Sequence, residues 1–168
     1  MSSQERTEII SQKTTIPQAS QEEKWHFIDV NEVENKAPGR IAVEISLYLQ
    51  GKKEVNCFPN FDHEIYVVLV NASKVEFTGK KLNDKLYYRH SGYPGGLKET
   101  SAKIMLEKNP IKLMESIVKG MLPPNKLRKR RMNRLFIFPD KEHNLQAREK
   151  NFIKINISSR RKKLLNNE

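Results

Sequence analysis

The sequence predicts an α/β fold: a single domain with a small, mainly parallel sheet flanked by helices. A length of 168 residues suits one domain. Short runs of β-branched and aromatic residues alternate with stretches whose apolar residues recur at helical spacing. A strand, a helix and a strand follow one another in that order, which favours a right-handed crossover between parallel strands.

The first three elements are predicted between residues 25 and 70. Residues 25–30 are rich in aromatic and β-branched residues, as is typical of a strand. Pro38 opens a helix that Gly51 ends. Residues 65–70 form a continuous apolar run, which favours a strand covered on both faces. The apolar face of the helix consists of Ile41, Ile45, Tyr48 and Leu49.

The elements after residue 70 are shorter. Residues 74–77 are expected to add a strand before Gly79, and residues 135–138 to form the last strand. Three helical stretches lie between them, one capped by Thr100 or Ser101, one restarted at Asn109-Pro110 and one beginning at Pro123-Pro124. Apolar residues at helical spacing in the second stretch indicate core packing, namely Met114, Ile117, Val118 and Met121.

The charge balance points to a polyanionic partner. The chain has 31 Lys and Arg against 20 Asp and Glu, for a net charge of +11. Nucleic acid and an acidic membrane surface are the two classes that fit such a field. Cys57 is the only cysteine, so the chain can form no disulfide within itself and no Cys-based zinc site. No metal or other cofactor is implied.

Composition divides the chain into three parts. Residues 1–23 have four acids and two bases, a net charge of −2, and too little apolar content to fold alone, so we expect a flexible N-terminal extension. An organelle presequence is the less favoured alternative for this segment, because its acids do not suit one. Residues 24–147 form the predicted core domain. Residues 148–168 form a basic tail, which we expect to be disordered alone and to become ordered on RNA.

Two segments carry the predicted binding chemistry. Six of the nine residues 126–134 are basic and none is acidic, so their mutual repulsion favours a bound polyanion. The alternative is a solvated helix face. Residues 80–98 mix cations, aromatics and glycines, which suits phosphate neutralisation, base stacking and close backbone approach. The alternative is a surface loop whose tyrosines pack on the domain.

Catalytic patterns are incomplete. A phosphate-binding P-loop requires adjacent Gly and Lys, but Lys98 stands two positions after Gly96. The four histidines show no metal-ligand spacing, and no Gly-x-Ser-x-Gly motif surrounds Ser91. We therefore expect no enzyme. An α/β enzyme that acts on nucleotides or RNA through the glycine-rich loop is the alternative, and a basic protein that docks on acidic membrane is a weaker one.

Two long motifs and several short ones stand in a recognisable order. The long ones are residues 87–98, Tyr-Tyr-Arg-His-Ser-Gly-Tyr-Pro-Gly-Gly-Leu-Lys, and residues 118–125, Val-Lys-Gly-Met-Leu-Pro-Pro-Asn. The short ones are Trp25 with Ile28-Asp29, Gly39-Arg40, residues 49–52, Asn71-Ala72, residues 78–80 and residues 142–144. Across residues 24–147 the chain resembles the universal large-subunit ribosomal protein thirteen family in its bacterial and organellar form.

The resemblance implies a small α/β domain that binds ribosomal RNA early in large-subunit assembly and contacts neighbouring ribosomal proteins. It implies no membrane and no small-molecule substrate. Pro124 stands where the family usually has Lys, Arg128-Lys129 replaces Gly-Arg, and the usual Pro-His is missing after His143. The residues predicted to bind RNA are Arg40, Lys52, Lys53, Lys80, Lys81, Lys85, Tyr87, Tyr88, Arg89, His90, Ser91, Tyr93, Lys98, Lys126, Arg128, Lys129, Arg130, Arg131 and Arg134.

The N-terminal extension and the basic tail lie outside the core of the family and resemble organellar elaborations. Low Ala content with many Lys, Asn and Ile residues favours an AT-rich genome. We therefore expect a mitochondrial ribosome, and a plastid or a bacterial cytoplasm stays open.

Overall fold

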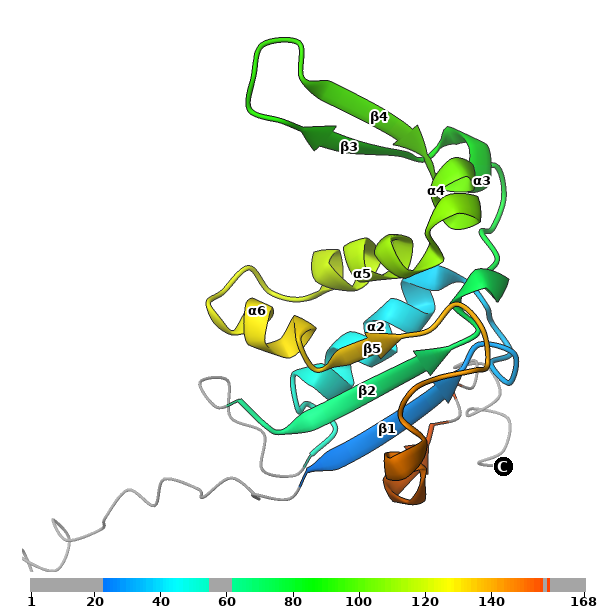
Figure 1. Ribbon diagram of the computed structural model, residues 1–168, viewed down its shortest axis with the longest axis vertical. Coiled ribbons are helices and arrows are strands. Elements are labelled where there is room, and N and C mark those ends of the chain that lie inside the picture. The colour runs from blue at the N-terminus through cyan, green and yellow to red at the C-terminus, as the bar shows by residue number, and fades with distance from the viewer. Residues whose placement is uncertain (1–22, 55–61, 156, 158–168) are drawn as a thin grey trace, which may run out of the picture.

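The computed structural model describes residues 23–54, 62–155 and 157 (Figure 1). Its centre is a four-stranded parallel sheet in the order β5-β2-β1-β6. The strands are β1 (Lys24–Asp29), β2 (Ile65–Val70), β5 (Leu135–Ile137) and β6 (Phe152–Lys154). The predicted α/β fold with a mainly parallel sheet is confirmed. Residues 1–22 of the predicted extension, and residues 156 and 158–168 of the predicted tail, lie outside the described residues.

The predicted crossover is formed by β1, α2 (Pro38–Leu49) and β2. The two strands pair over their full length, from Lys24 opposite Ile65 to Asp29 opposite Val70. Pro38 suits the first turn of α2 because it lacks an N–H that would have no partner there. Gly51 follows the helix at a φ of +72°, a conformation that favours glycine.

Two of the later helices begin where the sequence predicts caps. Ser101 accepts a hydrogen bond from the N–H of Ile104 and starts α4 (Ala102–Lys108). Asn109 accepts one from the N–H of Lys112 at 3.1 Å and starts α5 (Pro110–Met121). The third helical stretch, α6 (Leu127–Met132), begins a few residues after the two prolines.

The sheet is covered differently on its two faces. Val67, Leu69 and Ile28 pack against α2 and α5 in the main core. Trp25, with Val68 and Val70, belongs to a smaller cluster on the opposite face. The aromatic rings packed against that cluster are Phe27, Tyr66, Phe136, Phe138 and Phe152. Alternate residues of a strand point to opposite faces, which explains why β1, β2 and β5 each contribute to both clusters.

The hairpin β3 (Leu86–His90) and β4 (Leu97–Ser101) forms a second, antiparallel sheet after the short helix α3 (Lys81–Asp84). Figure 1 shows the hairpin extending away from the parallel sheet, beyond α5. The sequence predicts only a loop here. Most side chains of the two strands are exposed, so they lack the alternation of apolar and polar residues that identifies a strand.

Two further predictions differ from the structure. Residues 74–77 form no strand. The 3-10 helix Ala72–Lys74 is followed by an extended segment whose Val75 is buried in the core. The Glu76 N–H in this segment donates to the Lys36 carbonyl and not to a neighbouring strand. Residues 152–154, assigned by composition to the tail, form the edge strand β6 beside β1. Phe152 is opposite Trp25 there, so an aromatic contact holds this part of the tail segment on the sheet.

Candidate nucleic-acid interface

The residues predicted to bind RNA occupy three places in the fold. One group lies on the hairpin and on the segment that leads into it, residues 80–98. A second lies on and next to α6, residues 126–134. The third lies at the two ends of α2, with Arg40 in its first turn and Lys52 and Lys53 after its last.

The hairpin sorts its side chains onto two faces. Arg89 is directly opposite Lys98, and Tyr87 is opposite Thr100 on the same face. The other face presents Tyr88 and Leu97, whose side chains are largely exposed. Like charges placed opposite each other destabilise a sheet, and neither Arg89 nor Lys98 pairs with a carboxylate in the described part of the chain. A phosphate bound between them would remove that repulsion.

The tip of the hairpin has a defined shape that depends on glycine. Gly92 and Gly95 have φ of +91° and +70°. Gly96 lies so close to Ser91 that an added Cβ overlaps its hydroxyl, and its N–H donates to the Tyr93 carbonyl at 2.9 Å. His90 Nδ1 accepts the Gly92 N–H at 2.9 Å. Since Nδ1 accepts this hydrogen bond, the neutral ring carries its proton on Nε2, and His90 helps to hold the turn.

Helix α6 uses some of its cations inside the fold. Arg128 donates to the carbonyls of Leu122 and Pro123 at 2.9 and 3.1 Å, and so caps the end of the chain segment that leaves α5. Its backbone N–H donates to Asn125 Oδ1 at 3.1 Å. The side chain of Arg128 therefore has a structural role in addition to any contact with a partner.

Asp62 supplies the basic segment with an acidic partner that lies outside residues 126–134. Its carboxylate accepts two hydrogen bonds from Arg134, at 3.0 and 2.6 Å, in a bidentate pair. Arg131 Nε lies 3.6 Å from the same carboxylate, an ion-pair distance beyond hydrogen-bond range. Arg131 is buried and Arg134 nearly so. The acid that neutralises these two residues comes from a distant part of the sequence, so the segment taken alone did not indicate it.

Three cations of the segment are left facing solvent. Lys126, Lys129 and Arg130 are exposed, and in the described residues none of them pairs with a carboxylate. They lie on three of five consecutive positions, so their charges are close together without internal compensation. This arrangement suits contact with a phosphate backbone.

The two ends of α2 differ. Lys53 pairs with Glu44 at 3.3 Å and lies over the ring of Tyr48 at 5.7 Å, while Lys52 is exposed. Arg40, at the opposite end of the helix, is exposed and borders a cleft.

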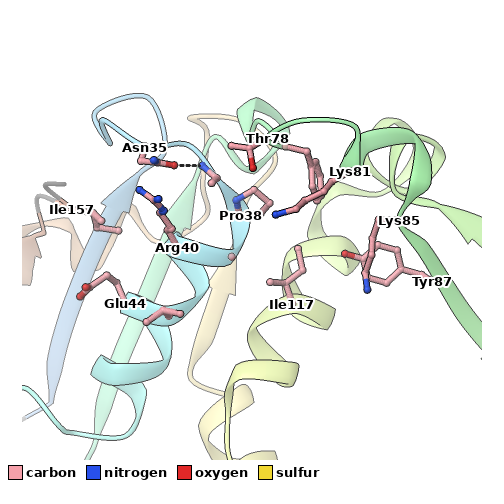
Figure 2. A pocket seen from close by; sticks show the side chains of 14 residues that line it. Asn35, Pro38, Arg40, Glu44, Thr78, Lys81, Lys85, Tyr87, Ile117 and Ile157 are labelled. Carbon is pink, nitrogen blue, oxygen red and sulfur yellow. Dashed lines mark hydrogen bonds between the residues drawn. The ribbon is translucent and has the colours of Figure 1, made fainter. Parts of the chain in front are cut away.

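That cleft lies between the first turns of α2, helix α5 and the base of the hairpin (Figure 2). Its volume is about 1240 Å³. Four of the residues predicted to bind RNA line it: Arg40, Lys81, Lys85 and Tyr87. Lys85 Nζ lies 5.8 Å from the centre of the Tyr87 ring, in cation–π contact. Burial raises the pKa of Tyr87, so its hydroxyl stays protonated at neutral pH.

Some partners at this surface left no signal in the sequence. Asp62 is joined to Arg131 and Arg134 only by the fold, and the apolar wall of the cleft, Val43 and Ile117, has the ordinary pattern of helix faces.

In residues 23–54, 62–155 and 157, no group of three or more His, Cys, Asp and Glu side chains is placed to hold a metal ion. Among the same residues, no helix is long and apolar enough to cross a membrane.

Comparison with known proteins gives a consistent result. Residues 23–144 match the model of the family described as ribosomal protein L13. The large ribosomal subunit protein uL13 of Thermotoga petrophila is 45% identical over 139 residues, which cover 82% of this chain and 91% of the relative. The protein of the same name in Staphylococcus epidermidis is 44% identical over 122 residues, 73% of this chain and 82% of the relative. The matched range includes the hairpin and α6.

Proposed function

The chain belongs to the ribosomal protein L13 family, and we propose that it is a structural constituent of the large ribosomal subunit, where it binds ribosomal RNA and supports subunit assembly and translation. The curated relatives are named as large-subunit proteins. The protein is a structural component and not an enzyme. Its other proposed partners are the neighbouring proteins of the large subunit, which it contacts.

One observation carries the RNA-binding part of this proposal. The exposed cations of the hairpin and of α6 lack acidic partners in the described residues, whereas buried Arg131 and its neighbour Arg134 have one. Within residues 126–134 the fold thus engages the cations that it encloses and leaves the exposed ones for a polyanion. Contact with phosphates would release counterions and neutralise these charges together.

The proposal is tested by removing only the exposed cations of α6. The triple variant Lys126→Ser, Lys129→Ser, Arg130→Ser spares Arg128 and Arg131, whose side chains serve the fold. The matched control is Lys103→Ser, Lys108→Ser, Lys141→Ser, which removes three exposed lysines from outside the predicted set. The probe is large-subunit ribosomal RNA of Staphylococcus epidermidis, and affinity is measured at several salt concentrations.

We expect the α6 variant to bind RNA more weakly. Its plot of log affinity against log salt concentration should be shallower by about 0.7 to 0.9 for each phosphate that the variant no longer neutralises. The control should keep most of its affinity and slope. Equal affinities and slopes for the two variants would contradict the assignment of α6 to the RNA surface.

We propose a mitochondrial ribosome as the location. The support is compositional: residues before and after the family match add an acidic, hydroxyl-rich segment and a basic one, and the chain is poor in Ala. A plastid and a bacterial cytoplasm are the alternatives, and the relatives named above are bacterial. Fractionation of source cells followed by detection of the tagged protein decides among the three; recovery outside mitochondria would contradict the location.

A further inference from the structure

We propose that the cleft between α2, α5 and the base of the hairpin binds one unpaired nucleotide of ribosomal RNA, with its phosphate near Lys81 and Lys85 and its base against the apolar wall. This inference rests on the proposed function and specifies the form of RNA that one part of the surface takes. The exposed cations of α6 and of the hairpin require only the phosphate backbone.

The charges that line the cleft favour an anion. Arg40, Lys81 and Lys85 line it together with one carboxylate, Glu44. Glu44 pairs with Lys53 at 3.3 Å, so its charge is already compensated from outside the cleft. The three cations have no carboxylate partner among the described residues. A phosphate is the anion that RNA supplies in this setting.

The shape and the walls favour a whole nucleotide over a bare phosphate. A volume of about 1240 Å³ exceeds the roughly 1,000 Å³ of large pockets for organic ligands, so the cleft has room for a whole nucleotide. Pro38, Val43, Phe77 and Ile117 form an apolar lining, and Val43 is 39% exposed. A base covers such a wall, whereas a lone phosphate leaves it in water. A base paired within a duplex is stacked and presents only its edge, so the occupant must be unpaired.

The positions of the side chains agree with this division of roles. Figure 2 shows Lys81 reaching toward Pro38 and Ile117, with Lys85 and Tyr87 on one side and Arg40 on the other side of Pro38. The Tyr87 hydroxyl points into the cleft in the same view. Tyr87 is held by its place opposite Thr100 and by the Lys85 ammonium over its ring. Since the hydroxyl stays protonated, it is a donor for a phosphate or ribose oxygen.

The test compares two RNA hairpins that differ in one unpaired adenosine. One carries a single-nucleotide bulge with a fluorescent adenine analogue, and the other is fully paired. Both are titrated with the full chain, with the variant Lys81→Ser, Lys85→Ser and with the control Lys103→Ser, Lys108→Ser, which removes two exposed lysines outside the cleft. A third variant, Lys81→Arg, Lys85→Arg, keeps the charge. Adenosine monophosphate serves as a competitor to represent a free nucleotide.

The unmodified chain should bind the bulged RNA more tightly than the paired one. On binding, the fluorescent adenine in the bulge should report that it no longer stacks on neighbouring bases. In the cleft variant, the ratio of the affinities for bulged and paired RNA should fall by about fivefold or more. The control should bind both RNAs more weakly by the same factor, and the Arg variant should keep the ratio of the unmodified chain. An unchanged preference in the cleft variant would overturn the inference. So would displacement of the bulged RNA from the protein by adenosine monophosphate at concentrations comparable to that of the RNA. Failure of the unmodified chain to bind either RNA would instead count against the proposed function.

Discussion

Asp62 determines how many cations of the basic segment are available to a partner. It pairs with Arg134 at 2.6 Å and lies 3.6 Å from Arg131, whose side chain is only 4% exposed. A buried guanidinium that loses its carboxylate is left uncompensated, which is costly. Arginines within one short segment therefore have two roles: Arg131 and Arg134 contact Asp62 inside the fold, and Arg130 faces solvent. Only the folded structure shows which arginine has which role.

Asp62→Asn is expected to lower the free energy of unfolding by about 2–4 kcal/mol, because it removes the charge that faces two enclosed arginines. Glu64→Gln, an exposed acid two positions later, is the matched control and should change stability by no more than about 0.5 kcal/mol. Urea unfolding followed by circular dichroism measures both. Equal values for the two variants would show that the arginines do not depend on Asp62.

His26 provides a prediction about pH. Burial lowers its pKa from the ordinary value of 6.5, Glu54 opposes that shift and Lys24 adds to it. The folded state then binds a proton less readily than the unfolded chain, so this residue makes stability fall as the pH drops below 6.5 toward the lowered folded value. Neither ring nitrogen of His26 has a hydrogen-bond partner in the described residues.

His26→Leu should therefore flatten the dependence of unfolding free energy on pH between neutral and mildly acidic conditions. Thermal melts at a series of pH values measure this dependence for the unmodified chain and for the variant. A slope that is the same in both proteins would mean that His26 does not titrate with folding.

At the scale of elements, the hairpin tip joins local geometry to binding. An Ala side chain at Gly96 overlaps the Ser91 hydroxyl and comes within 2.9 Å of the Tyr93 carbonyl oxygen, so the turn must shift. Gly120, on α5, has open space around it and serves as a control. We expect Gly96→Ala to weaken RNA binding with little effect on global stability, because the hairpin stands outside the core.

Gly120→Ala should leave RNA binding unchanged and stabilise the protein by about 0.5–1 kcal/mol, since Ala is the better helix former. Amide hydrogen exchange across residues 86–101 should rise only in the Gly96 variant. Unaltered exchange and affinity in that variant would argue against a shaped hairpin tip.

The elements that bury apolar runs could be predicted from the sequence. Residues 65–70 became a central strand, and the helical spacing from Ile41 to Leu49 became the helix that covers it. The hairpin escaped prediction because Tyr88 and Leu97 are exposed and give no alternating pattern. Strand β6 escaped it because three residues within a basic segment give too short a signal, and its place beside β1 is a tertiary contact.

The chemistry of the candidate surface was also partly predictable. Composition identified both basic segments, and the motif of residues 87–98 located the glycine-dependent turn. The division of the cations into enclosed and exposed ones was not visible, since Asp62 is distant from Arg131 and Arg134 along the chain. The cleft was not visible either, because it brings together Arg40, Lys81 and Ile117 from separate elements.

At the scale of the whole molecule, the net charge of +11 becomes a property of particular surfaces. The parallel sheet and its two clusters supply the rigid body. The hairpin and α6, which carry exposed cations, lie at its periphery (Figure 1). An isolated two-stranded hairpin is marginally stable in water. We infer that bound RNA stabilises the hairpin as well as neutralising it.

Sedimentation of a lysate from cells that express the tagged full chain tests the central claim most directly. The account predicts that the protein migrates with large ribosomal subunits at low salt, and that rising salt releases the Lys126, Lys129, Arg130 variant before the unmodified chain. A protein that stays at the top of the gradient at low salt, apart from ribosomal particles, would contradict it.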